Sequence, residues 1–189
     1  MITPVRTARR AAAAAAAFAA AALTVAAAIS AWPTPAAATT AATPRCAAHD
    51  LGVWVAADYG KVAAGTAFEQ LEFTNVSHRS CTLDGFPKVS AIAINGHQLG
   101  SPASQDHSVT ARTVQLAAGA TAHAVLEYRD VVVGNCPSAS QRVAFELKVY
   151  PPGASRPDHA FWDLVTCTAR GSSDFLGIQV VLSGSGIAG

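Results

Sequence analysis

Charged side chains are scarce in this sequence. They make up 13% of the chain, and the formal net charge is +1. A nucleic-acid-binding domain needs a clustered basic face, and an anionic membrane surface attracts polybasic segments. The composition therefore argues against a nucleic-acid partner and offers little electrostatic attraction to lipid.

The spacings that are typical of metal and catalytic sites are also missing. Met1 is the only methionine, and no two of the six histidines stand in an H-x-H or H-x3-H spacing. Zinc and copper sites need several ligands that converge, commonly from such short spacings. The nearest match to the nucleophile motif G-x-S-x-G, Ser183–Gly186, falls in the C-terminal tail. We therefore predict no catalytic residue, no metal site and no cofactor, and we interpret the histidines as structural or solvated.

The N-terminus has the three parts of a secretory signal peptide. Met1–Arg10 carries three arginines and no acid, Ala11–Ala31 is an apolar run, and Ala36–Ala38 offers small residues for cleavage. We predict a signal peptide over residues 1–38 that is cleaved after Ala38. The apolar run is also long enough to span a bilayer, so an uncleaved anchor is the alternative.

The remainder is the length of one domain. Thr39–Arg45 is small, polar and proline-containing, which predicts a flexible leader, and the glycine- and serine-rich Ser183–Gly189 predicts a flexible tail. Residues 46–182 between them form the predicted domain. After signal cleavage no membrane span is expected, and the product would be secreted, extracellular or cell-wall associated.

Alternating apolar residues predict β-strands along this domain. In Val143–Val149 the odd-numbered residues are apolar and the even-numbered ones are mostly polar, so we expect Val143, Phe145, Leu147 and Val149 to face a core. Thr121–Tyr128 and Phe175–Leu182 show similar alternation. Less regular apolar runs occupy five further segments: Leu51–Val55, Ala67–Thr74, Val89–Ile94, Thr110–Leu116 and Phe161–Thr166.

Turn residues separate these runs, and Asn95-Gly96 is the strongest two-residue hairpin signal among them. No segment of the domain shows a convincing helical period. About eight short, regularly punctuated strands predict an all-β fold, either a sandwich or a barrel.

All four cysteines lie in the predicted exported domain, which favours two disulfides because the count is even and the compartment is oxidising. They are Cys46, Cys81, Cys136 and Cys167. Three pairings are possible. Antiparallel pairing of neighbouring strands would place Cys46 beside Cys81, and Cys136 beside Cys167, so we favour these two links.

The segment Leu71–Pro87 resembles a known family. It contains an apolar strand, an Asn followed closely by Ser, and then Cys81-Thr-Leu-Asp-Gly-Phe-Pro87. This order resembles the secreted actinobacterial family catalogued as domain of unknown function 4232, and the resemblance extends from about Cys46 to Leu182. It implies an Ig-like antiparallel β-sandwich in a secreted or envelope-attached protein, and it implies no activity.

The Cys81–Pro87 motif also has a physical interpretation. Asn75 can adopt the left-handed turn that ends a strand, Gly85 permits a bend that other residues resist, and the Phe86–Pro87 bond could be cis. We interpret the motif as a folding corner. Trp162 is expected to pack near the disulfide of Cys167, as a buried Trp does in Ig-like domains.

A polar loop, Gly96–Val109, is the longest candidate for binding, because a sandwich presents ligands to its loops. Trp54 lies between apolar neighbours and is expected in the core; if exposed, it could stack on a sugar or a partner. The possible binding residues are Trp54, His97, Gln98, Gln105, Asp106 and His107.

The sequence thus favours a non-enzymatic module with a binding or structural role at the cell envelope and an unidentified envelope or extracellular ligand. Two alternatives stay open. One is a secreted enzyme whose site assembles from scattered residues, which predicts a deep pocket with converging acids or histidines. The other is a secreted protease inhibitor, which predicts a protruding, braced loop.

Overall fold

Strands dominate the computed structural model, which describes residues 42–131, 134–169 and 175–186. The predicted signal peptide, residues 1–38, lies outside the described residues. The regular elements apart from strands in the described part are two short 3-10 helices, η1 (Ala48–Asp50) and η2 (Ser138–Ser140). None of the helices in this part is long and apolar enough to cross a membrane.

The larger sheet has six strands. Its order is β1-β2-β8-β11-β6, and β12 pairs with β8. All neighbours run antiparallel except β11 and β6, which are parallel. The strands are β1 (Leu51–Ala63), β2 (Thr66–Asn75), β8 (Thr121–Arg129), β11 (Leu176–Ile178), β6 (Ser104–Gln105) and β12 (Leu182–Ser183).

The second sheet has four antiparallel strands in the order β10-β9-β4-β5, and β3 pairs with β7 in a separate ribbon. These strands are β10 (Asp158–Cys167), β9 (Gln141–Tyr150), β4 (Lys88–Ile92), β5 (Gln98–Leu99), β3 (Cys81–Leu83) and β7 (Val114–Leu116). The Asn95-Gly96 turn joins β4 to β5, as its sequence predicts.

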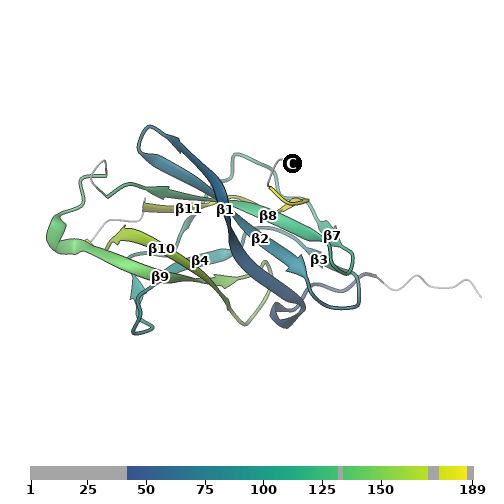
Figure 1. Cartoon of the computed structure of the whole chain (residues 1–189). Helices are drawn as coiled ribbons and strands as arrows, with labels where there is room; N and C mark the ends of the chain where they lie inside the picture. The colour runs from purple at the N-terminus through teal and green to yellow at the C-terminus, as the bar shows by residue number, and fades with distance from the viewer. Residues whose placement is uncertain (1–41, 132–133, 170–174, 187–189) are drawn as a thin grey trace, which may run out of the picture. The chain divides into compact units, whose positions relative to one another are not determined.

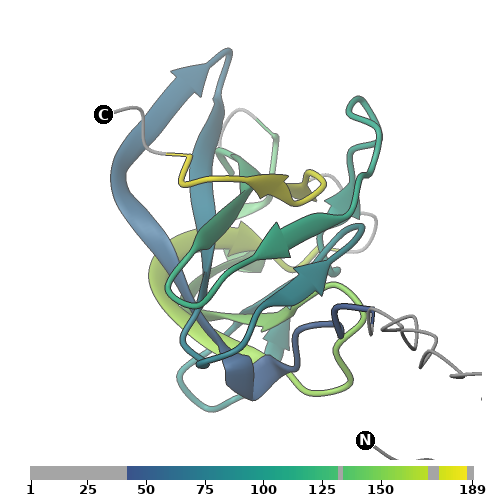
Figure 2. The same cartoon turned by 90° about the vertical axis from the view of Figure 1, so that its right-hand side faces the viewer.

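The two sheets form a sandwich, with β1, β2, β8 and β11 in one layer and β4, β9 and β10 in the other (Figures 1 and 2). Side chains from both layers meet in one apolar core. Leu71 and Phe73 of β2 and Leu147 and Val149 of β9 are fully buried there. The all-β sandwich is therefore confirmed. The described residues form more strands than the eight predicted, because β3, β5 and β6 are additional and the predicted Phe175–Leu182 is divided into β11 and β12.

Strand β8 follows its predicted alternation, whereas β9 does so only in part. Ala122, Ala124 and Leu126 of β8 are completely buried. In β9, Leu147 and Val149 face the core as expected, but Val143 and Phe145 are 48% and 41% exposed. The pairing of β9 with β10 shifts between Phe161/Glu146 and Leu164/Ala144, where two residues of β10 oppose one of β9.

This β-bulge explains the difference. Beyond the shift, Ala144 takes the inward position and its apolar neighbours turn outward. Val165, which is paired with Val143, and Phe161 are exposed on the same hairpin, Phe161 to 86%. A large side chain can thus be apolar and still face solvent when the strand beside it carries an extra residue.

Two disulfides link Cys46 to Cys81 and Cys136 to Cys167. This is the pairing favoured by the sequence, and its reason holds: β1 pairs antiparallel with β2, and β9 with β10. The second link joins a small apolar cluster with Val131 and Phe175, apart from the main core.

Both ends of the described chain make backbone hydrogen bonds to strands of the domain. The amide of Cys46 and the carbonyl of Pro44 hydrogen-bond to Thr82 of β3, each at 2.9 Å. At the other end, β12 pairs with β8 and the amide of Gly186 donates to Glu72. A buried carboxyl on β2 thus binds the backbone of a segment for which the sequence predicts a flexible tail.

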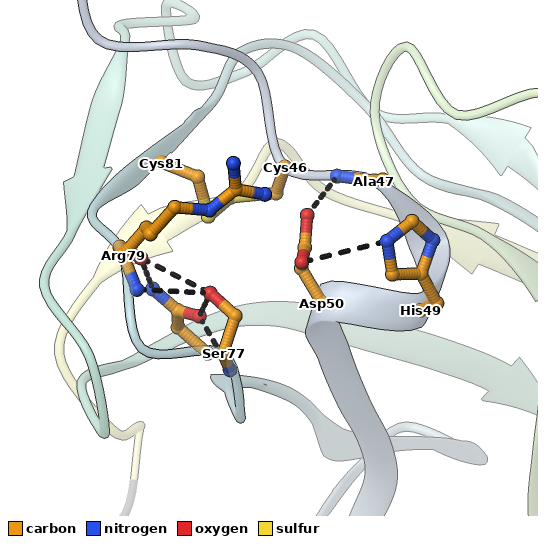
Figure 3. A network of polar contacts seen from close by, with 8 residues as sticks. Cys46, Ala47, His49, Asp50, Ser77, Arg79 and Cys81 are labelled. Carbon is orange, nitrogen blue, oxygen red and sulfur yellow. Dashed lines mark hydrogen bonds and ion pairs between the residues drawn. A yellow bond between two sulfur atoms is a disulfide. The ribbon is translucent and has the colours of Figure 1, made fainter.

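Asn75 has a different role from the predicted left-handed turn. Its φ angle is not positive, and its side chain is fully buried. The amide nitrogen donates to the carbonyls of Arg79, Leu116 and Ala117, and Oδ1 accepts from the amide and hydroxyl of Ser77. Figure 3 shows Ser77 and Arg79 beside the Cys46–Cys81 disulfide. Asn75 thus ties the β2–β3 turn to β7.

The folding corner is otherwise as expected, with Gly85 at φ +100° and a trans bond before Pro87. The two tryptophans are placed differently from the prediction. Trp54 is 42% exposed, because Val53, and not Trp54, points into the core. Trp162 packs edge-to-face on Tyr128, with 4.9 Å between ring centroids, beside the main core and not at the Cys136–Cys167 cluster.

Candidate functional site

A pocket of about 280 Å³ lies against the outer face of the four-stranded sheet and is the strongest candidate site. We call it the β4–β9 pocket. Strands β4 and β9 form its floor, and β5, β6 and the segment between them form its wall. Its lining residues are Pro87, Lys88, Ser90, Gln98, Pro102, Ala103, Gln105, Lys148 and Tyr150.

Strand alternation explains why polar residues gather on this floor. Val89, Ala91, Leu147 and Val149 are fully buried and point into the sandwich, so the residues between them point outward. The register places Lys88 opposite Tyr150 and Ser90 opposite Lys148. Four outward side chains from two neighbouring strands therefore form one continuous polar surface.

The charge of this pocket is positive. Lys88 and Lys148 are two of only three lysines in the sequence, and no Asp or Glu lines the pocket. The Nζ atom of Lys148 lies 5.6 Å from the centroid of the Tyr150 ring. Glu146, the nearest acid on the same face of β9, is 3.1 Å from Nδ1 of His159 on β10. The pocket thus presents two ammonium groups with no carboxylate among its lining residues.

The wall is braced from both sheets. The amide of Ala103 donates to the carbonyl of Val89 on β4 at 2.8 Å, and Ser104 Oγ donates to the carbonyl of Leu176 on β11 at 3.1 Å. Gly100 adopts a φ of +67°, and a Cβ there would lie 2.7 Å from the carbonyl oxygen of Cys167. The loop therefore packs directly on the backbone of a disulfide cysteine, which holds the wall in place.

The predicted loop residues divide into two groups. Gln98 and Gln105 line the β4–β9 pocket, where Gln98 Nε2 donates to the carbonyl of Gly100 at 3.1 Å. Asp106, His97 and His107 are not among its lining residues. The structure thus brings together two of the five loop residues proposed from the sequence.

Asp106 instead organises its own loop. Its carboxylate accepts hydrogen bonds from the amide and hydroxyl of Ser108 at 2.9 and 2.8 Å, and from Nε2 of Gln179 at 3.1 Å. The bonds from the Ser108 amide and hydroxyl hold the pKa of Asp106 below its ordinary value. His107 packs on Phe86, with 4.6 Å between ring centroids. Both residues fix the loop next to the folding corner.

The remaining candidates lie elsewhere. His97 is exposed beside the Asn95-Gly96 turn, and its amide donates to Asn95 Oδ1 at 3.2 Å. Trp54 is on β1, opposite Glu72 in the six-stranded sheet, and so belongs to the other layer of the sandwich. Neither contributes to the β4–β9 pocket.

Sequence reasoning missed Lys88, Ser90, Lys148 and Tyr150. Each is an ordinary outward residue on its own strand, and only the pairing of β4 with β9 brings the four together. One signal was available: in a chain with three lysines, two stand at outward positions of strands. That scarcity could have singled them out.

A larger pocket, of about 790 Å³, lies between η1 and the loop that joins β9 to β10. Most of its lining residues are small or apolar, and the polar ones include His49, Ser155, Arg156 and Asp158. The ring of His49 is 3.6 Å from Asp50, whose other oxygen accepts from the amide of Ala47 (Figure 3). Among the described residues, no hydrogen bond joins Ser155 to His49, so these groups form no nucleophile–base pair.

Within the described part of the chain, no three side chains of His, Cys, Asp or Glu come together as a metal-binding group. Deeply buried polar atoms occur instead under the C-terminal residues, where Gln70 and Glu72 are 2% and 1% exposed. Burial raises the pKa of Glu72, while the Gly186 amide and His123 act in the opposite direction.

Comparison with known proteins gives one match. The family model described as a domain of unknown function, DUF4232, matches residues 46–180, which include both disulfides and the whole β4–β9 pocket. No curated protein and no solved structure matches the chain.

Proposed function

We propose that this chain, which belongs to the DUF4232 family, is an exported, non-enzymatic module that binds a component of the cell envelope in the β4–β9 pocket. The observation that carries the proposal is the convergence of Lys88, Lys148, Tyr150, Gln98 and Gln105 on one concave surface. Small-ligand sites are concave and combine apolar walls with a few polar groups that fix the ligand.

The polar groups of this pocket are available to a ligand. The side chains of Lys88, Ser90, Gln105 and Tyr150 make no hydrogen bond to any described residue, and the ammonium group of Lys148 lies near the Tyr150 ring. Prolines 87 and 102 and the braced segment supply a rigid wall. Rigid walls favour binding because little conformational entropy is lost when the ligand arrives.

Export is supported by the two disulfides, which form and persist in oxidising compartments. The predicted N-terminal signal peptide points in the same direction. Because the chain is exported in this proposal, its ligand is sought among the components of the envelope. The lining includes no acid, histidine or cysteine, and no hydrogen bond among the described residues pairs its serine or tyrosine with one of its lysines as a nucleophile is paired with a base. A binding role therefore fits the β4–β9 pocket better than catalysis does.

The test is co-sedimentation of the full chain, produced by export through its own N-terminal segment, with insoluble cell-wall material of the source organism. Wild-type protein should pellet with the wall. Lys88→Glu/Lys148→Glu should stay in the supernatant, because two attractive charges become repulsive.

Two control variants locate the effect. Arg112→Glu changes an exposed cation outside both pockets and should pellet like wild type. Arg156→Glu changes the larger pocket at η1 and should also pellet. Equal sedimentation of wild type and the double lysine variant would overturn the proposed site, as would selective loss in Arg156→Glu.

A further inference from the structure

The ligand class can be narrowed from the chemistry of the β4–β9 pocket. We propose that the pocket binds a saccharide or polyol unit that carries an anionic group, a carboxylate or a phosphate. This inference rests on the proposed binding function and specifies its ligand.

The charge of the lining calls for an anion. Lys88 and Lys148 point outward from neighbouring strands, where Lys88 is paired with Tyr150 and Lys148 with Ser90, so the two lysines are diagonal neighbours. No carboxylate lines the pocket to neutralise them. The carboxylate of Glu146, two residues from Lys148, contacts the ring of His159. An anionic group between the two ammonium groups would gain charge-assisted hydrogen bonds from both.

The rest of the lining suits hydroxyl groups. Gln98 and Gln105 offer amides that both donate and accept, and Ser90 and Tyr150 offer hydroxyls that do the same. The hydroxyls of a saccharide have this dual character and can pair with such groups in either sense. A purely apolar ligand would leave these groups without partners, which costs free energy when they are desolvated.

The size of the pocket limits the ligand to a short unit. Its volume of about 280 Å³ is near the lower end of small-ligand sites, which span roughly 300–1,000 Å³. The cations are lysines and no arginine lines the pocket, so the anion is held by point charges and not by a planar fork. A lysine ammonium group can bind a carboxylate or a phosphate equally, and the experiment therefore includes both anions.

The sequence makes the measurement direct. With three lysines in the chain, reductive ¹³C-methylation gives few NMR signals, and Lys88→Arg and Lys148→Arg variants assign the two of interest. The full exported protein is titrated with two matched pairs of probes: galacturonate against its methyl ester, and glucose 6-phosphate against glucose. Inorganic phosphate alone is the fifth probe.

We expect the acidic member of each pair to shift the Lys88 and Lys148 signals and the neutral member to leave them in place. Replacing either lysine with Gln should weaken binding about tenfold, since a hydrogen bond to a charged group contributes about that factor. Lys→Arg at the same position should restore most of the affinity. Gln105→Leu should weaken sugar binding but leave the response to inorganic phosphate unchanged.

Three results would overturn the inference. Equal shifts with neutral and acidic sugars would show that the pocket does not require an anionic group. A response to inorganic phosphate as strong as to glucose 6-phosphate would show that it does not require a saccharide. If no probe shifts the lysines while the wild-type chain still pellets with cell walls in a lysine-dependent manner, the ligand class is wrong and the binding function stands. If neither the probes nor the walls bind, both proposals fail.

Discussion

The amide of Gly186 donates a hydrogen bond of 3.0 Å to Oε1 of Glu72, across 114 positions of the sequence. The other carboxyl oxygen, Oε2, has no hydrogen-bond partner among the described residues, and neither does Oε1 of the neighbouring Gln70. Both residues lie on the face of β2 that the C-terminal residues cover. Near them, Nδ1 of His123 is 2.8 Å from the carbonyl oxygen of Gly184.

The first prediction concerns pH. Burial raises the pKa of Glu72, so the folded state holds the proton more tightly than the unfolded state does. The contribution of Glu72 to stability is then fully present below its ordinary pKa and is lost as the pH rises through the raised value. Glu72→Gln should remove this loss. The variant should gain stability relative to wild type between acidic and neutral pH.

Glutamine at position 72 also keeps an acceptor for the Gly186 amide and adds a donor on the side of Gln70. Satisfying buried polar atoms of this kind contributes about 1–3 kcal/mol. Urea unfolding at several pH values measures the difference, with Asp84→Asn, an exposed acid, as the control for the loss of one charge. A stability difference between Glu72→Gln and wild type that is independent of pH would contradict the argument.

The second prediction concerns Asn75. Replacing it with Asp removes the donor to the carbonyls of Arg79, Leu116 and Ala117 and buries a charge among them. We expect a loss of about 3–5 kcal/mol, in the range found when a buried polar network is broken. Asn95→Asp, on an exposed turn, should cost less than about 0.5 kcal/mol. Similar unfolding midpoints for the two variants would show that the network is not stabilising.

The third prediction concerns the two disulfides. Their sequence separations of 35 and 31 residues are similar, so on the chain-entropy model each should contribute about 3–4 kcal/mol. Cys46→Ala/Cys81→Ala and Cys136→Ala/Cys167→Ala should therefore be destabilised alike. They should differ in binding, because only the second pair lies against the wall of the β4–β9 pocket, at Gly100. Equal wall binding by the two variants would contradict this bracing role.

The fourth prediction tests the bulge in the β9–β10 hairpin. Leu147→Ala should cost about 2–5 kcal/mol, because its side chain is fully buried. Phe145→Ala, two positions away and 41% exposed, should cost about 1 kcal/mol or less. Denaturant unfolding of the two variants gives the comparison. A larger loss for Phe145→Ala would restore the regular alternation expected from the sequence.

The fold could be predicted where each strand depends on its own pattern. The alternation of β8 gave the correct buried face, and strand order gave the correct cysteine pairs. Strand β9 could not be predicted fully, because the faces of Val143 and Phe145 depend on one extra residue in β10. Trp54 has apolar neighbours on both sides, so its exposure depends on which face of β1 the sandwich encloses.

The candidate site was only half accessible from the sequence. Gln98 and Gln105 stand in a visibly polar loop, so composition alone selects them. Lys88 and Tyr150 are 62 positions apart and meet only through the register of β4 with β9. Asp106 and His107 look equally polar, yet local hydrogen bonds and ring packing direct them to the loop itself. Register and packing, not residue type, decide which polar groups converge.

The Cys46–Cys81 link also determines how the domain carries mechanical load. Tension applied at residue 45 acts on Cys46, which precedes β1, and the disulfide transmits this tension to Cys81 at the start of β3. The β1–β2 hairpin lies within the loop that this disulfide closes, with a sequence separation of 35, so the covalent path of the pull bypasses the hairpin. About 120 Å of chain, at 3.3–3.6 Å per residue, therefore cannot be extended by the pull until the disulfide is reduced. Under load from its N-terminal side, the oxidised domain behaves as a short and stiff coupling.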